Sequence, residues 1–277
     1  TSVSLFQVNA HGHAQIFGWV GLFVMGFACQ AFPRMRRTSL WQPGLALLAY
    51  YLMLAGIVAR TLGEPFCTFA PLRLLALAGA TSEALAIGLF VVVIGRTIQH
   101  SGAALAWSDG YVFAALAFFF IQAIYEWGLL LATTGAATHA ALLAVIAPWQ
   151  APLRDIQIHG FALLMIFGVG LRLFPPLLGL PARSPRLART CLFLLLAAIA
   201  GEVTFFLLMR QTGHHAWAGA LYLSILTLAG ACLALTWRWL PARRAARPER
   251  SRKFVQAAAR WLNISMLMLV LAPLYMF

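Results

Sequence analysis

The sequence predicts an all-α protein that crosses a membrane several times, as a polytopic bundle of transmembrane helices. Composition and patterning both support this class. Of the 277 residues, 62% are hydrophobic and only 10% are charged, and the mean hydropathy is +0.84. Apolar runs of about twenty residues, the length that crosses a bilayer as a helix, recur from one end of the chain to the other.

Hydropathy divides the chain into eight predicted spans. At about 1.5 Å per residue, each is long enough to cross a hydrocarbon core of about 30 Å. We treat residues 1–277 as a single transmembrane domain. The spans are predicted at residues 11–33, 41–62, 72–95, 110–132, 154–178, 190–210, 216–238 and 255–277.

The loops between the predicted spans differ in charge. Arginines cluster after the first, third, fifth and seventh spans, most densely in the loop 241–253, whereas the opposite side receives only scattered arginines at span ends, such as Arg60. Positively charged loops face the cytoplasm, so we expect a multi-pass inner-membrane protein with both termini on the periplasmic side. In this topology only His100 lies inside, and the outer half or outer loops hold His11, His13, His139, His159, His214 and His215.

The net charge of +13 does not indicate a nucleic-acid partner, because the basic residues lie where membrane topology requires them. The loop 241–253 is expected to lie near anionic lipid. The four cysteines form no CxxC or CxxCH motif, which argues against a cysteine-rich zinc site and a covalently attached c-type haem. The sequence also lacks motifs for phosphate binding, a serine nucleophile or a zinc protease.

The first and fifth predicted spans resemble each other. Both begin outside near a histidine and end inside at a Phe-Pro pair. At an offset of 142 residues, the matches are Gly18, Leu22, Gly26, Phe32 and Pro33 with Gly160, Leu164, Gly168, Phe174 and Pro175. This weak repeat predicts pseudo-repeats 1–140 and 141–277, an arrangement known in membrane proteins. Gly18 and Gly160 remove side-chain bulk where a helix or a flat macrocycle approaches.

The one-sided set of histidines indicates a metal or haem site, because neutral imidazole is the commonest side-chain metal ligand and a common axial haem ligand. The repeat selects His13 and His159 as the axial pair. His11 lies two residues before His13, about 200° around a regular helix, and joins His214 and His215 as a candidate ligand of a second metal. We expect no role for His139 and His100.

Three glutamates lie inside predicted spans, where a buried carboxylate is costly in lipid and usually faces the bundle interior. For Glu83, Glu126 and Glu202, proton transfer, support of a metal ligand, and structural pairing with Arg172 or a histidine all stay open. Glu126 lies near the outer end of its span and suits the orientation of a ligating histidine. The other two lie nearer mid-membrane and suit a proton path or a hydrogen bond between helices.

One stretch near the N-terminus, followed by Gly26-Phe27 and Pro33, resembles the opening motif of the NnrS family: His11-Gly12-His13-Ala14-Gln15-Ile16-Phe17-Gly18-Trp19-Val20-Gly21. Residues 159–175 resemble it more loosely. Members are polytopic bacterial membrane proteins that contain haem and copper and are associated with the response to nitric oxide. Ala14 and Gln15 stand where members usually carry an acidic residue, and the chain has fewer spans than members usually have. The histidine pairs are also distantly similar to those of haem-copper oxidases and nitric oxide reductases.

The resemblance implies a protein that holds haem b, and copper as a further option, and that binds or redox-processes a small ligand such as nitric oxide or transfers electrons in the membrane. As an enzyme it would be an oxidoreductase. Its short loops leave no domain to receive electrons, so a partner cytochrome or another subunit of a membrane complex is expected. The alternative is a cofactor-free transporter coupled to protons or metal ions, or an accessory subunit, in which histidines and buried carboxylates form the path.

Overall fold

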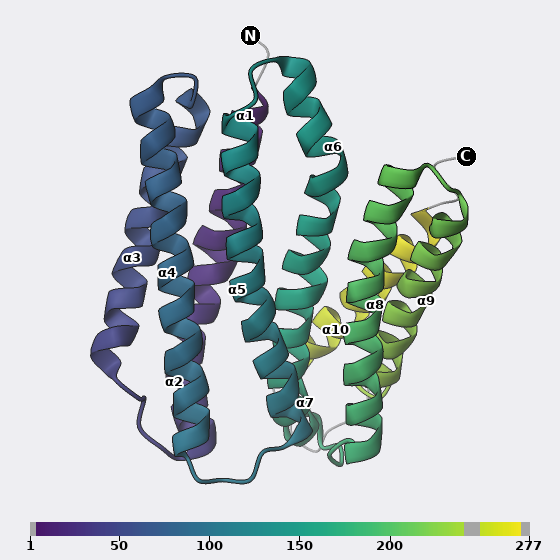
Figure 1. Cartoon of the computed structure of the whole chain (residues 1–277). Helices are drawn as coiled ribbons and strands as arrows, with labels where there is room; N and C mark the ends of the chain where they lie inside the picture. Colours follow the sequence, from purple (N-terminus) through teal and green to yellow (C-terminus); the bar gives the residue numbers. More distant parts are fainter. Residues whose placement is uncertain (1–3, 241–249, 273–277) are drawn as a thin grey trace. The chain divides into compact units, whose positions relative to one another are not determined.

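The computed structural model describes residues 4–240 and 250–272 (Figure 1). Every regular element in these two ranges is a helix. Eight helical segments within them are long and apolar enough to cross a membrane, and exposed apolar side chains such as Trp19 and Leu223 suit contact with lipid. The predicted all-α polytopic bundle is confirmed.

The chain forms two compact units, each described by itself. The first unit comprises the described residues 4–104 and 116–149, and the second comprises 105–115, 150–240 and 250–272. Two helices, α5 (Trp107–Thr134) and α6 (His139–Asp155), contribute to both units. The pseudo-repeat boundary after residue 140 stays a prediction.

The first unit opens with three helical segments that follow one another without a break and form the first span. The hydroxyl of Ser4 caps this span by accepting a hydrogen bond from the backbone N–H of Gln7 at 3.2 Å. In order, the elements are α1 (Leu5–His13), η1 (Ala14–Gly21), α2 (Leu22–Arg36), α3 (Pro43–Gly63), the short 3-10 helix η2 (Glu64–Phe66), α4 (Ala70–His100) and the parts of α5 and α6 in this unit.

The second unit contains the start of α5, the end of α6 and the five elements that follow α6. Its core includes Trp239, which is 2% exposed and packs against the rings of Phe167 and Phe174. After α6, the elements are η3 (Ile156–Leu163), α7 (Leu164–Leu178), α8 (Pro185–Thr212), α9 (Ala216–Thr236) and α10 (Arg250–Leu271).

The eight spans agree with the predicted ones in number and order, but the fifth is much longer than predicted. Its predicted start is residue 154, whereas the helical segment covers His139–Leu178, 40 residues. Pro148 and Pro152 lie inside α6, although each proline removes a backbone hydrogen-bond donor. At about 1.5 Å per residue the segment is about twice the thickness of a hydrocarbon core, so part of it extends beyond the core.

The predicted basic loop 241–253 lies partly outside the described residues, which omit 241–249. Residues 250–253 are not a loop, because α10 begins at Arg250. The described part of the last span ends earlier than predicted, at Leu271, and residues 273–277 again lie outside the described ranges.

The repeat between the first and fifth spans is also present in the helix geometry. Each span contains a π-helical segment of 8 residues followed by an α-helix of 15 residues. The segments η3 and α7 begin 142 residues after η1 and α2, the offset at which the sequences align. Both α-helices end at a residue with left-handed backbone, Arg37 (φ 52°) and Gly179 (φ 65°), so the repeat extends to the turn that ends the span.

Helices α3 and α4 of the first unit approach each other at backbone distance. A Cβ atom added to Gly56 would lie 2.7 Å from the carbonyl oxygen of Gly79. A Cβ atom on Gly63 would lie 2.5 Å from the carbonyl oxygen of Leu72. Small residues permit such close packing of membrane helices, and here it brings charged side chains of α3 and α4 together.

Candidate functional site

Both π-helical segments lie beside the histidines selected by the repeat. His13 is the last residue of α1, directly before η1, and His159 lies within η3. A π-helix closes i→i+5 hydrogen bonds, occurs mostly as short insertions in α-helices, and is frequent at functional sites. A π-helix has more residues per turn than an α-helix. The α-helical repeat of 3.6 residues therefore does not tell which residues of these segments lie on the same face.

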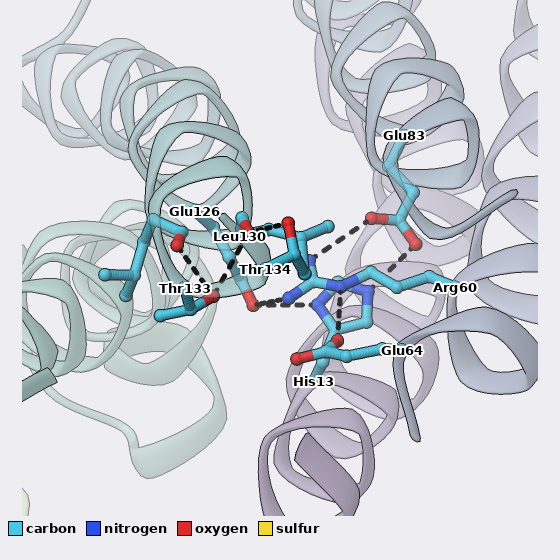
Figure 2. A network of polar contacts seen from close by, with 9 residues as sticks. His13, Arg60, Glu64, Glu83, Glu126, Leu130, Thr133 and Thr134 are labelled. Carbon is cyan, nitrogen blue, oxygen red and sulfur yellow. Dashed lines mark hydrogen bonds and ion pairs between the residues drawn. The ribbon is translucent and has the colours of Figure 1, made fainter. Parts of the chain in front are cut away.

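The ring of His13 lies between two glutamates (Figure 2). Its Nδ1 is 2.9 Å from Oε1 of Glu126, and its Nε2 is 2.8 Å from Oε1 of Glu83. The ring also packs against Phe17, with 4.4 Å between ring centroids. Both ring nitrogens are therefore engaged by carboxyl groups from α4 and α5.

Arg60 of α3 joins the same network (Figure 2). Its Nε donates a hydrogen bond to Oε2 of Glu64 at 2.9 Å, and its Nη2 donates one to Oε1 of Glu126 at 3.0 Å. Its Nη1 lies 3.8 Å from Oε2 of Glu83. Three carboxylates thus surround one guanidinium and one imidazole.

We call this group the arginine–histidine network: His13, Arg60, Glu64, Glu83 and Glu126. All five residues are buried, with at most 6% of their surface exposed. Charges buried to this degree are tolerated when they are paired and hydrogen-bonded. Oε1 of Glu126 contacts both the His13 ring and the Arg60 guanidinium, so the network is continuous rather than a set of separate pairs.

The second unit contains a different group, the acidic–histidine cluster, formed by Asp155, His159 and Glu202. Nδ1 of His159 lies 2.9 Å from Oε2 of Glu202. One potential ligand atom of each residue lies within 4.8 Å of those of the other two, and no other group of three or more His, Cys, Asp or Glu residues in the described ranges meets this criterion. His159 is 7% exposed and Glu202 is 2% exposed.

The two groups occupy matching places in the repeat but carry different residues. At the offset of 142, Asp155 corresponds to His13, and Glu202 corresponds to Arg60. Both basic residues of the first unit, His13 and Arg60, are therefore replaced by acidic residues at the corresponding positions of the second unit. The helix pattern is the same in both units, but the side chains at these two positions differ in charge.

His11 faces away from the arginine–histidine network. It is exposed, whereas His13 is only 1% exposed, which agrees with the angle of about 200° between residues two apart in a helix. A hollow of about 780 Å³ lies beside the start of the first span. Its lining residues are His11, Ala14, Gln15, Ile16, Gly18, Trp19 and Val20.

The remaining predicted site residues lie elsewhere in their units. His214 and His215 are exposed in the turn before α9, and His139 is exposed at the start of α6. His100 donates a hydrogen bond from Nδ1 to the carbonyl oxygen of Arg96 at 2.9 Å. Gly160 is buried.

Of the two partners predicted for the span glutamates, Arg172 or a histidine, the structure shows the histidine. Arg172 instead lies 4.0 Å from Asp109. Each of the three span glutamates contacts a histidine: Glu83 and Glu126 contact His13, and Glu202 contacts His159.

Three residues of the two groups were not selected from the sequence: Arg60, Glu64 and Asp155. A signal for two of them exists in the repeat, since Arg60 and Asp155 align with Glu202 and His13. Glu64 carries a local signal, because it follows Arg60 by four residues, a spacing at which opposite charges pair on a helix.

Cys67 lies in the turn after η2, the short helix that begins at Glu64. It is a free cysteine and is 4% exposed. Burial raises the pKa of its thiol, and the negative charge of Glu64 raises that pKa further. The thiol therefore stays protonated at neutral pH.

The chain thus holds two intramembrane groups, each with a histidine hydrogen-bonded to a glutamate from another helix. Groups of this kind mark functional sites in membrane proteins, because buried ionisable residues are rare and costly in lipid. Comparison of the chain with models of known protein families, with curated proteins and with solved structures found no match.

Proposed function

We propose that the chain is a haem-binding protein of the NnrS type in a bacterial inner membrane, which binds or redox-processes a small ligand such as nitric oxide or transfers electrons within the membrane. The observation that carries this proposal is the hollow of about 780 Å³ beside His11. Binding sites for small molecules and cofactors typically have volumes of about 300–1,000 Å³. The hollow lies along the stretch that resembles the NnrS motif, so cavity and motif support the same function.

An axial haem ligand needs a ring nitrogen without a competing partner. His13 does not fit this requirement, because both of its nitrogens lie within 2.9 Å of carboxylate oxygens. His11 fits, because it lines the hollow and no described residue hydrogen-bonds to its ring. We therefore assign the axial position to His11 in place of His13. His159 belongs to the other unit and is not assigned an axial position.

The residues around His11 suit a flat, apolar group. Bound haem would supply reversible binding of nitric oxide and one-electron transfer. Gly18 lines the hollow without a side chain, and the nearest atom to a Cβ added there is a methyl carbon of Ile57 at 3.8 Å. Trp19 is 81% exposed and offers an aromatic face. Copper binding by His214 and His215 stays a prediction.

The test is an absorption spectrum of the protein purified in detergent from cells supplied with haem, recorded oxidised and reduced. We expect a Soret band with reduced α and β bands. In the His11→Ala variant these bands should be lost or strongly reduced, because the ligand is removed. The matched control is His139→Ala, which removes an exposed histidine outside the hollow and should leave the spectrum unchanged.

Absence of haem from the pure wild-type protein would contradict the proposed function. A spectrum that survives His11→Ala but disappears in His159→Ala would contradict the assignment of His11 while leaving haem binding intact. Nitric oxide added to the reduced protein should shift the Soret band, and an unshifted band would argue for electron transfer without ligand binding.

The arginine–histidine network favours a second candidate, a cofactor-free transporter or accessory subunit that conducts protons. The network connects three carboxyl groups through His13 and Arg60 by contacts of 2.8–3.8 Å. Imidazole can accept a proton on one nitrogen and release one from the other.

Proton movement can be measured in vesicles that contain the purified protein and a pH-sensitive dye. If the second candidate is correct, an applied membrane potential should drive proton uptake, and His13→Gln should abolish it. The control is His100→Gln, because His100 is exposed and lies outside the network, with its ring beside Trp41 and its Nδ1 hydrogen-bonded to the backbone carbonyl of Arg96. Equal uptake in His13→Gln and the wild type would exclude the network as the path.

A further inference from the structure

The acidic–histidine cluster has the spacing of a metal site. Asp155 and His159 lie four residues apart at the junction of α6 and η3, and Glu202 approaches from α8. Nδ1 of His159 and Oε2 of Glu202 are 2.9 Å apart. Two ligands bound at about 2.1 Å from a metal ion and at right angles lie about 3 Å apart, so these two atoms already have the separation of adjacent ligands.

The cluster contains more negative than positive charge. Its two carboxylates and one imidazole have ligand atoms within 4.8 Å of one another. Among the residues that the structure describes, no arginine or lysine forms an ion pair with Asp155 or Glu202. The neighbouring Arg154 instead donates a hydrogen bond to Oε1 of Gln157 at 2.8 Å.

The first unit shows how the negative charge of buried carboxylates is offset by a cationic side chain. There, Arg60 occupies the repeat position of Glu202 and contacts three glutamates. The second unit has a carboxylate at that position and therefore lacks the fixed cation. Two carboxylates inside a membrane span need either protons or a cation to offset their charge.

Two groups of the cluster also lack hydrogen-bond partners. Within the described ranges, no group donates a hydrogen bond to the Asp155 carboxylate, and Nε2 of His159 has no partner. His159 is 93% buried, since only 7% of it is exposed. The Asp155 carboxylate is therefore available to bind an ion together with His159 and Glu202.

We propose that Asp155, His159 and Glu202 bind a divalent non-haem metal ion. Two carboxylate oxygens and one imidazole nitrogen suit Fe²⁺, Mn²⁺ or Zn²⁺ better than Cu⁺, which prefers thiolate and thioether sulfur. Three protein ligands leave coordination positions open to water or a small exogenous ligand. The site is distinct from the hollow at His11 and goes beyond the proposed haem protein.

The experiment measures bound metal in the full-length protein after chelator treatment, reloading with Fe²⁺, Mn²⁺ or Zn²⁺, and removal of free ions. The wild type should bind one of these ions in near-stoichiometric amount. Asp155→Asn, His159→Gln and Glu202→Gln preserve side-chain size, and each should reduce occupancy at least about tenfold. The control is Asp109→Asn, which changes a buried aspartate of the same unit beside Arg172 and should retain metal.

A spectroscopic measurement on the wild type does not depend on the folding of any variant. In the Mn²⁺-loaded protein, electron spin-echo modulation should detect a directly coordinated imidazole nitrogen. A wild type that binds none of the three ions, or whose bound Mn²⁺ has no nitrogen ligand, would overturn the proposal. Full occupancy in all three cluster variants would also overturn it.

The same samples separate this proposal from the haem proposal. His11→Ala should lose haem and keep the divalent ion, whereas Glu202→Gln should lose the ion and keep the Soret band. Loss of both groups in Glu202→Gln, with helix content preserved, would contradict a metal site that is separate from the haem.

Discussion

Replacing Arg60 with methionine is expected to lower the free energy of unfolding by about 3–5 kcal/mol, because it leaves buried carboxylates without their shared cation. Arg60 contacts Glu64 and Glu126 at 2.9 Å and 3.0 Å and lies 3.8 Å from Glu83. In the variant, His13 would be the one basic side chain left in the network. Methionine is similar in length, so the change tests charge rather than packing.

The loss of helical signal during thermal unfolding in detergent measures this effect, with Arg73→Met as the control. Arg73 is exposed near the start of α4, so its substitution should change the free energy of unfolding by no more than about 0.5 kcal/mol. Adding Glu64→Gln to Arg60→Met removes one of the unpaired carboxylates and should restore part of the stability. Equal unfolding temperatures for Arg60→Met and Arg73→Met would show that the guanidinium does not stabilise the network.

The spans could be predicted from sequence because a bilayer selects apolar segments of one length. The length of the apolar segment does not give the ends of a helix that continues beyond the hydrocarbon core of the membrane. The segment before residue 154 is helical from His139 onward and carries Pro148 and Pro152. Residues 140–149 are themselves almost entirely apolar, so hydropathy alone does not locate where the membrane span begins within the segment of 40 residues.

The site could be predicted only in part. Glu83, Glu126 and Glu202 stand out because carboxylates inside spans are rare. Arg60 does not stand out, because a long arginine side chain near a span end can extend to the membrane interface. Its contacts depend on the close approach of α3 and α4, a tertiary feature that local periodicity does not contain. In the proposed function His11 takes the axial position that the sequence assigned to His13, because both ring nitrogens of the buried His13 contact carboxylates.

The repeat relates the two groups of polar residues to a common backbone plan. The first and the fifth spans each combine a π-helical segment with an α-helix of 15 residues. Each of these two spans also provides the histidine of a buried histidine–glutamate contact. The first unit neutralises its glutamates with Arg60, whereas the second carries Glu202 at the corresponding position. The proposed metal ion in the second unit would therefore perform the electrostatic role that a guanidinium performs in the first.

The second large effect is expected for Gly56→Ala, which adds a methyl group at the crossing of α3 and α4. The new Cβ atom would lie 2.6 Å from Cγ of Glu83 and 2.7 Å from the carbonyl oxygen of Gly79. Because one of these contacts is to backbone, moving a side chain cannot relieve both. We expect a loss of about 1–3 kcal/mol in the free energy of unfolding, measured by the same thermal unfolding in detergent.

Gly128→Ala is the matched control, since it makes the same change in a helix of the same unit with no atom within 4 Å of the added Cβ. Alanine favours the helix over glycine by up to about 1 kcal/mol, so this variant should be as stable as the wild type or more stable. Opposite signs for the two glycine variants would locate the effect in the helix crossing.

Because Arg60 and Glu83 each follow a crossing glycine by one turn, separation of α3 from α4 should also weaken the network. Arg60→Met should then cost less in the Gly56→Ala background than in the wild type, and simple additivity of the two substitutions would show that the crossing does not hold the network together.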